Sequence, residues 1–144
     1  MAAMTADVIV DRVRSICVGS PFAFTEAQSW ASWDQQPAQN DDKVFRIVPP
    51  ASQFVQGGFA FLDDRRDSMQ IWVARRTAAD YDAVRRALLK DMHSLTSAIV
   101  RDGAVSSGDY DIPDGGRGHA ILEDPGREFA TLRLTLPINY ESQL

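Results

Sequence analysis

The stretch Arg127-Glu-Phe-Ala-Thr-Leu-Arg-Leu-Thr-Leu-Pro-Ile-Asn-Tyr-Glu141 alternates apolar and polar residues over about ten positions. Alternate side chains of a strand share a face, which predicts Ala130, Leu132, Leu134 and Leu136 on one face and Phe129, Thr131, Arg133 and Thr135 on the other. One buried face and one face toward solvent or a partner is typical of an antiparallel sheet. Pro137 cannot donate a backbone hydrogen bond, so the strand ends there or lies on an edge.

Other segments predict the rest of the sheet. Gly118–Glu123 reads as the hairpin partner of the last strand, with Asp124–Gly126 as the turn. Val44–Val48 reads as a short strand halted by Pro49-Pro50, with a loop following over Ala51–Gly58.

A further hairpin is predicted in the middle of the chain. It would join Phe59–Leu62 to Met69–Ala74 through a charged tip at Asp63–Asp67. Two segments are expected to be irregular: a long loop over Phe22–Asp42 and a polar, glycine-rich connector over Ser106–Gly118.

Two amphipathic helices are predicted. The first covers Thr5–Val18, with Thr5 as its cap, and Gly19-Ser20-Pro21 stops it. The second follows Thr77, which with Asp80 resembles a capping box, and ends near Gly103 after roughly 25 residues. Its apolar stripe comprises Tyr81, Val84, Leu88, Met92, Leu95 and Ile99.

This order of elements predicts an α+β fold. We expect a mainly antiparallel sheet covered by one long amphipathic helix, plus a short N-terminal helix. A chain of 144 residues fits one domain, which we place at residues 1–144 with an extended loop near 22–42.

The composition excludes some classes of function. The chain has 15 basic and 20 acidic residues, a formal net charge of -5, which disfavours a surface that grips nucleic-acid phosphates. No apolar run approaches the roughly 20 residues that span a bilayer, so we expect no membrane. The first residues lack the pattern of a signal peptide. A single cysteine, Cys17, allows no internal disulfide.

No motif predicts a catalytic group, cofactor or metal. Asp109–Gly116 fails the EF-hand spacing, because positions five, six and twelve are Pro113, Asp114 and Ala120. Gly115–Gly118 lacks the Lys-Ser/Thr pair of a P-loop. The two histidines have no neighbouring ligands at metal-binding spacing: we expect His93 on a helix flank. On the first helix we expect a buried, inert Cys17.

A set of aromatic and basic residues is the candidate interface: Trp30, Trp33, Phe54, Arg65, Arg66 and Arg133. The aromatic residues stand in loop-like segments. They either tuck under the loops as a satellite core or anchor a protein interface, where large aromatic residues are enriched. Acidic residues surround the arginine pairs, so ion pairs within or between subunits are favoured over nucleic-acid contacts.

The layout resembles the tail terminator (tail completion) proteins of long-tailed bacteriophages and related phage-like particles. The resemblance covers essentially the whole chain as an order of elements. It rests on the helix at Thr5–Val18, the strand and extended loop at Val44–Gly58, the hairpin at Phe59–Ala74, the helix opened by Thr77-Ala-Ala-Asp80, and the final strand Phe129–Leu136. Met69-Gln-Ile-Trp-Val-Ala-Arg-Arg76, which leads into that helix, is similar to the family's sequences. The long 22–42 segment departs from the compact members.

The resemblance implies a structural protein rather than an enzyme. Members form a ring, expected to be hexameric, at the head-proximal end of the tail tube. The ring stops tube polymerisation and joins the tail to the connector or stopper protein on the head side. Genomic DNA passes through the central channel without sequence-specific binding. The implied location is the virion tail or neck, after synthesis in the host cytoplasm.

Two alternatives stay open. Another neck or tail component, such as a head–tail stopper or tube protein, shares the sheet-plus-helix plan. A small α+β enzyme or ligand-binding domain would place Tyr110, His119 and Glu123 around a pocket. Against the enzyme stands the lack of a nucleophile with an evident base.

Overall fold

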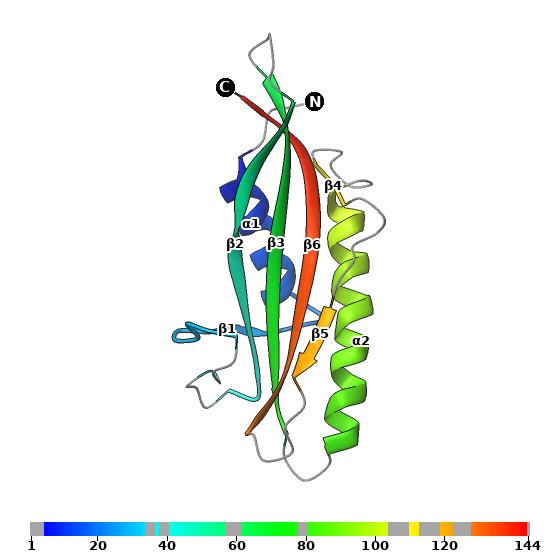
Figure 1. Ribbon diagram of the computed structural model, residues 1–144. Helices are drawn as coiled ribbons and strands as arrows, with labels where there is room; N and C mark the ends of the chain where they lie inside the picture. The colour runs from blue at the N-terminus through cyan, green and yellow to red at the C-terminus, as the bar shows by residue number, and fades with distance from the viewer. Residues whose placement is uncertain are drawn as a thin grey trace.

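The computed structural model describes residues 5–33, 37, 41–56, 62–77, 81–103, 110–112, 119–122 and 128–143. For residues 49–56, 62–67, 119–122 and 141–143 it describes the backbone alone. The elements in chain order are α1 (Ala6–Val18), β1 (Thr25–Glu26), β2 (Lys43–Gln56), β3 (Leu62–Arg76), α2 (Tyr81–Val100), β4 (Tyr110–Asp111), β5 (His119–Leu122) and β6 (Phe129–Gln143) (Figure 1).

The six strands form one mixed sheet in the order β1-β2-β3-β6-β4, with β5 also paired to β6. Only the short β1–β2 pairing is parallel among the described strands; the others are antiparallel. The α+β class and the mainly antiparallel character of the sheet are confirmed. The antiparallel pairing predicted for the opening stretch is confirmed too, because His119–Leu122 pairs with residues 131–134 of β6; the predicted turn Asp124–Gly126 lies outside the described residues.

Both helices lie on the same face of the sheet (Figure 1). α1 packs against β2, α2 packs against β3 and β6, and the two helices contact each other. The prediction that one long helix covers the sheet was therefore too simple. Residues Ile9, Val13 and Cys17 of α1 are fully buried in the same core as Leu88, Leu95 and Ile99 of α2.

The first helix follows its sequence signals. The Thr5 hydroxyl accepts a hydrogen bond from the Val8 N–H at 3.4 Å, which caps one of the free amides of the first turn. At the other end the Gly19 N–H donates to the Ser15 carbonyl at 3.0 Å. The predicted capping box of α2 includes Asp80, which lies outside the described residues, so it stays a prediction.

The strand predicted at Val44–Val48 is longer than expected. β2 runs through Pro49-Pro50 to Gln56, and its pairing with β3 shifts register between Val48 and Ala51. The shift places three steps of β2 against two of β3, as in a β-bulge. Prolines are tolerated at bulges and at edges, and no described strand pairs with β2 beyond Phe45 on its other side. The prediction that the prolines halt the strand, with a loop after them, was wrong for residues 51–56.

The predicted hairpin over Phe59–Ala74 was also wrong. Asp63–Asp67 is not a tip but part of β3: Asp64–Asp67 pairs with both β2 and β6, and Asp63 pairs with β6. The real hairpin joins β2 to β3, and residues 57–61 between them lie outside the described residues. Five charged side chains in a row hid the strand, because a run without apolar residues shows no alternating pattern.

The last strand does not end at Pro137. β6 continues to Gln143 in register with β3, and Pro137 stands opposite Ser68. On its other side Pro137 falls between the residues paired to β5 and those paired to β4, where the described chain offers no strand partner. Of the two predicted alternatives for Pro137, the second is therefore correct: among the described strands, β6 is a sheet edge at this residue. Much of the predicted connector Ser106–Gly118 lies outside the described residues, but Tyr110–Asp111 within it forms β4.

A polar cluster joins α1, α2 and β4. The Tyr110 hydroxyl donates to the Asp102 carboxylate at 2.8 Å and lies 3.1 Å from the Ile99 carbonyl. Arg12 pairs with Asp102 at 2.9 Å and its guanidinium lies 5.2 Å from the Tyr110 ring centroid. Burial and the Asp102 carboxylate raise the pKa of Tyr110, so the phenol stays protonated and structural.

Gly103→Ala should lower the free energy of unfolding by about 1–3 kcal/mol, because the added methyl overpacks this cluster. A Cβ at position 103 would lie 2.5 Å from the Tyr110 ring and 2.7 Å from the Tyr110 carbonyl oxygen. Urea denaturation of the purified protein measures the loss. In a Tyr110→Leu background the same substitution should cost less, and a loss below about 0.5 kcal/mol in the wild-type background would contradict the clash.

Candidate interaction surface

The face of the sheet away from the helices carries a second, smaller core. Its buried members are Trp30, Val44, Trp72, Ala74 and Phe129, with Ala27, Trp33 and Val48 packed against them. Segment 27–33 therefore covers one part of this outer face. That covering explains why Phe129 is buried, although the sequence predicted its face to meet solvent or a partner; Thr131 on the same face is buried too.

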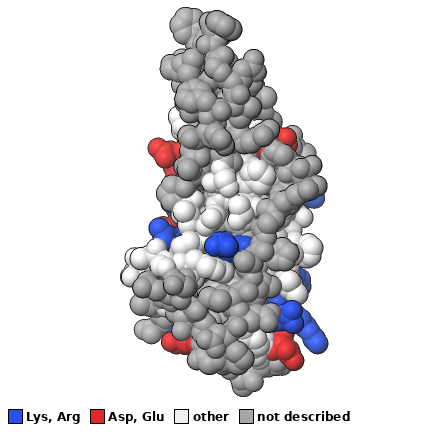
Figure 2. Space-filling view, viewed as in Figure 1, with Lys and Arg blue, Asp and Glu red and all other residues white. Residues whose placement is uncertain are grey.

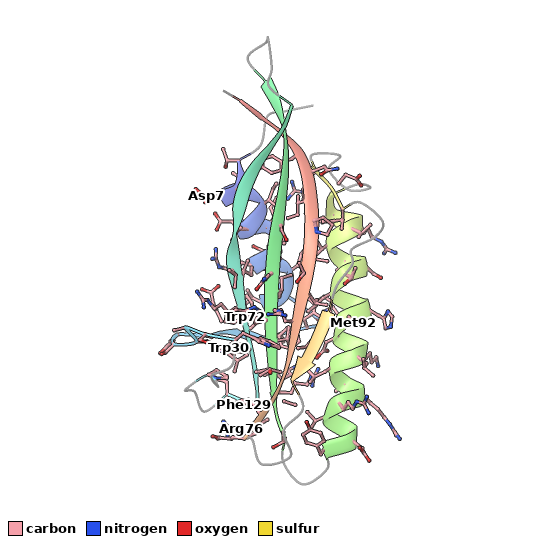
Figure 3. All side chains as sticks on the ribbon, in the orientation of Figure 1. Asp7, Trp30, Trp72, Arg76, Met92 and Phe129 are labelled. Carbon is pink, nitrogen blue, oxygen red and sulfur yellow. The ribbon has the colours of Figure 1, made fainter. Side chains whose placement is uncertain are left out.

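Three tryptophans form the centre of this cluster. The ring of Trp72, on β3, lies edge-on to Trp30 at 5.4 Å and to Trp33 at 5.8 Å between centroids. Such edge-to-face pairs add to the stabilisation from burial. Figure 3 shows Trp30 and Trp72 side by side, with Phe129 and Arg76 nearer the end of the sheet. The Trp72 indole N–H donates to Gln70 at 3.0 Å.

The predicted interface residues divide into two groups. Trp30, Trp33 and Arg133 meet on the outer face, where Arg133 lies 5.1 Å from the Trp33 ring centroid. Trp30 is only 3% exposed, which matches the satellite-core alternative, while Trp33 and Arg133 are half-buried. Whether Trp33 and Arg133 meet another protein stays a prediction.

The other predicted interface residues lie further along the strands. Phe54 and Arg65 stand opposite each other in the β2–β3 pairing, and Arg66 pairs with Asn139 of β6. Their side chains lie outside the described part of the structure. Arg65 pairs with Tyr140, seven positions beyond Arg133 on β6. At about 3.3 Å per residue the two groups are roughly 23 Å apart.

Two arginines flank Trp72 in direct cross-strand register. Arg46 of β2 and Arg133 of β6 are the partners of Trp72 on either side. The Arg46 guanidinium lies 5.0 Å from the Trp72 ring centroid and donates to the Trp30 carbonyl at 2.5 Å. Among the described residues, no carboxylate pairs with either arginine.

We define the outer patch as Trp33, Arg46, Val48, Gln70, Arg133 and Thr135. All six are half-buried, and they occupy two adjacent rows across β2, β3 and β6 together with Trp33 above them. In Figure 2 the described surface in the centre of this side is mainly uncharged, with basic atoms within it and acidic atoms at its margins. The outer patch thus combines two apolar side chains, two uncharged polar side chains and two positive charges.

The opposite face holds an ion pair with two hydrogen bonds. Arg75 of β3 donates twice to Asp91 of α2, with Nε–Oδ2 at 2.6 Å and Nη2–Oδ1 at 2.8 Å. The Asp91 side chain is 9% exposed and the Arg75 side chain 25%. Sequence reasoning missed this pair. The signal was present, because Asp91 lies three residues after Leu88 and four before Leu95 in the apolar stripe.

Two hollows lined by described residues lie outside the outer patch. The first, about 450 Å³, is bordered by Lys43, Arg75 and Arg76 together with Asp42 and the start of α2. Its arginines are already paired: Arg75 with Asp91, and Arg76 with Asp42 and Glu128. The second hollow, about 460 Å³, lies between the two helices, with Ile16, Phe22 and Ala98 among its lining residues.

The described residues offer little reactive chemistry. Burial raises the pKa of the Cys17 thiol to about 12, so at neutral pH it is protonated, as expected for an inert buried cysteine. His93 is exposed on α2, as predicted. Within the described ranges, no group of three or more His, Cys, Asp or Glu side chains could hold a metal. Of the pocket imagined around Tyr110, His119 and Glu123, only the tyrosine has a described side chain.

No protein-family model matches the chain, and a search of curated proteins found no significant match. Neither helix described by the structure is long and apolar enough to cross a membrane.

Trp30→Ala should destabilise the fold by about 3–5 kcal/mol, because it removes a buried indole from the outer-face cluster. Trp33→Ala should cost less, since Trp33 is only half-buried and its removal leaves the contact between Trp30 and Trp72 in place. Denaturant unfolding of both variants makes the comparison. Equal losses, or a larger loss at Trp33, would contradict the assignment of Trp30 to the core.

Asp91→Asn should lower the free energy of unfolding by about 2–4 kcal/mol, because it leaves the half-buried Arg75 without a charged partner. The double variant Arg75→Met with Asp91→Leu should return to within about 1 kcal/mol of wild type, since neither charge remains to be desolvated. Thermal and denaturant unfolding measure both. If Asp91→Asn is as stable as wild type, the ion pair does not hold α2 on the sheet.

Proposed function

We propose that this chain is the tail terminator of a long-tailed bacteriophage or a related phage-like particle. In this role it is a structural virion protein that forms a ring, expected to contain six copies, on the head-proximal end of the tail tube. The ring stops tube polymerisation and joins the tail to the connector or stopper on the head side. The genome passes through its channel without sequence-specific contacts.

The observation that carries the proposal is the length of the sheet relative to its helical cover. Strands β3 and β6 have 15 residues each and are about 50 Å long, whereas the 20 residues of α2 span about 30 Å. Figure 1 shows β2, β3 and β6 continuing beyond both helices at the upper end of the view. Strands that continue beyond their helices offer edges and faces on which neighbouring subunits can pair or pack.

The outer face supports the same reading. Beyond the part covered by segment 27–33, it has no second layer among the described residues, and it carries aromatic and basic groups. Arg and aromatic residues are enriched at protein interfaces. The net charge of -5 suits a channel through which DNA slides without adhering. Under this proposal the protein is located in the virion tail or neck, after synthesis in the host cytoplasm.

The alternatives predict different behaviour. A tube protein would stack on copies of itself through both ends, and a head–tail stopper would bind the connector without arresting tubes. An enzyme or ligand-binding domain would gain thermal stability with a specific small molecule, by linkage between binding and folding.

Adding the purified protein to polymerising tail tube protein tests the proposal. We expect shorter tubes, each capped at one end by a ring, in negative-stain micrographs at protein amounts well below the tube protein. An unrelated acidic protein of similar size is the control and should leave tube length unchanged. Incorporation along the tubes would indicate a tube protein, and unaltered tubes would contradict the terminator function.

A further inference from the structure

The outer patch has an acidic counterpart on the other side of the molecule. The outward side of α1 carries exposed residues at helical spacing: Asp7, Val8, Asp11, Ser15 and Val18. Val8 and Val18 are the large hydrophobic residues that the described chain exposes, at 45% and 52%. We call these five residues the α1 stripe.

The α1 stripe is complementary to the outer patch in charge and in polarity. Asp11 is engaged by Arg14 at 2.6 Å, and Arg14 also binds Glu26 at 2.5 Å. Asp7 has no such basic partner in the part of the chain that the structure describes, and Figure 3 shows it on α1, away from the tryptophans. One surface thus combines apolar side chains with negative charge, and the other combines them with positive charge.

The two surfaces cannot meet within one chain. α1 buries Ile9, Val13 and Cys17 against the inner face of the sheet, so its stripe faces away from the sheet. The outer patch lies on the opposite face of that sheet. A contact between them therefore joins two copies front to back. Contacts of this heterologous kind produce closed rings when the rotation between copies closes.

We propose that the α1 stripe of one copy docks on the outer patch of the next, with Asp7 paired to Arg133. Val8 and Val18 then cover the half-buried Trp33 and Val48 region of the neighbour. This inference deepens the proposed function and rests on it, because it names the surfaces through which the ring forms. A second copy of this chain is the partner that fits the charge of the outer patch: the chain as a whole has an excess of acidic residues, and the outer patch is basic.

A charge swap between copies tests the pairing. Arg133→Glu and Asp7→Arg should each weaken self-association by about tenfold or more, because each places like charges across the contact. The double variant, with both changes in one chain, should restore self-association, since every contact then again joins an arginine to a carboxylate. Sedimentation velocity across a dilution series, with and without tail tubes, measures association.

Two matched controls separate docking from folding. Asp82→Arg changes an exposed acid in the first turn of α2 and should cost the same helix-dipole stabilisation as Asp7→Arg without altering association. Arg133→Lys keeps the charge and should associate nearly as wild type. Cooperative melting of every variant shows that the monomer still folds.

The outcomes distinguish the two proposals. If wild type assembles and caps tubes but both single variants do so equally well, or the double variant stays impaired, this pairing is wrong and the terminator function stands. If wild type neither assembles nor caps tubes, both are wrong. If Arg133→Glu instead abolishes retention on a single-stranded oligonucleotide while association is unchanged, the outer patch contacts nucleic acid and the pairing is again wrong.

Discussion

The alternation of side chains along β6 is the constraint on which the rest of the structure depends. Its register with β3 is unbroken from the pair Leu62–Gln143 to the pair Arg76–Phe129. Because successive side chains point to opposite faces, a slip of one residue would carry every buried leucine of β6 to the outer face. The helices fix the inner face and the tryptophans part of the outer one, so two independent packings hold the same register.

The register also decides which arginines face the helices and which face outward. Arg75 faces the helices and binds Asp91, whereas Arg76 faces outward, with its guanidinium 4.6 Å from the Phe129 ring centroid. Arg46 and Arg133 also face outward, and within the described chain their contacts are aromatic rings and a carbonyl oxygen. One face of the sheet thus uses charge to attach a helix, and the other presents charge at a surface that the helices leave open.

The sequence patterns correctly predicted those features that depend on residues close together in the chain. The helical spacing of Ile9, Val13 and Cys17, the caps of α1, the apolar stripe of α2 and the hairpin of β5 with β6 follow from near neighbours in sequence. Strand length did not follow, because the run Asp63–Asp67 has no apolar residue that could show alternation, and Pro49-Pro50 falls at a shift of register that the sequence does not reveal. Opposite Asp67 and Arg65, the residues Ile138 and Tyr140 of β6 still lie in the main core. The β1 strand has two residues, too few to show the alternating pattern by which a strand is recognised in a sequence.

The candidate surface was predicted only in part. Trp33 and Arg133 were chosen for their residue types, and the fold brings them into contact. Trp72 and Arg46 were missed because their role depends on cross-strand register, and Asp91 was missed because a charge in an apolar stripe can be interpreted only with its partner Arg75 in view.

The central claim is that this fold works as a ring of copies. The most direct measurement is the mass of the purified protein by light scattering across a dilution series, alone and with tail tubes added. The account predicts a particle near six times 15.9 kDa, either free or formed on the tubes. A protein that stays monomeric at every concentration, ignores tubes and is stabilised by a small molecule would contradict it.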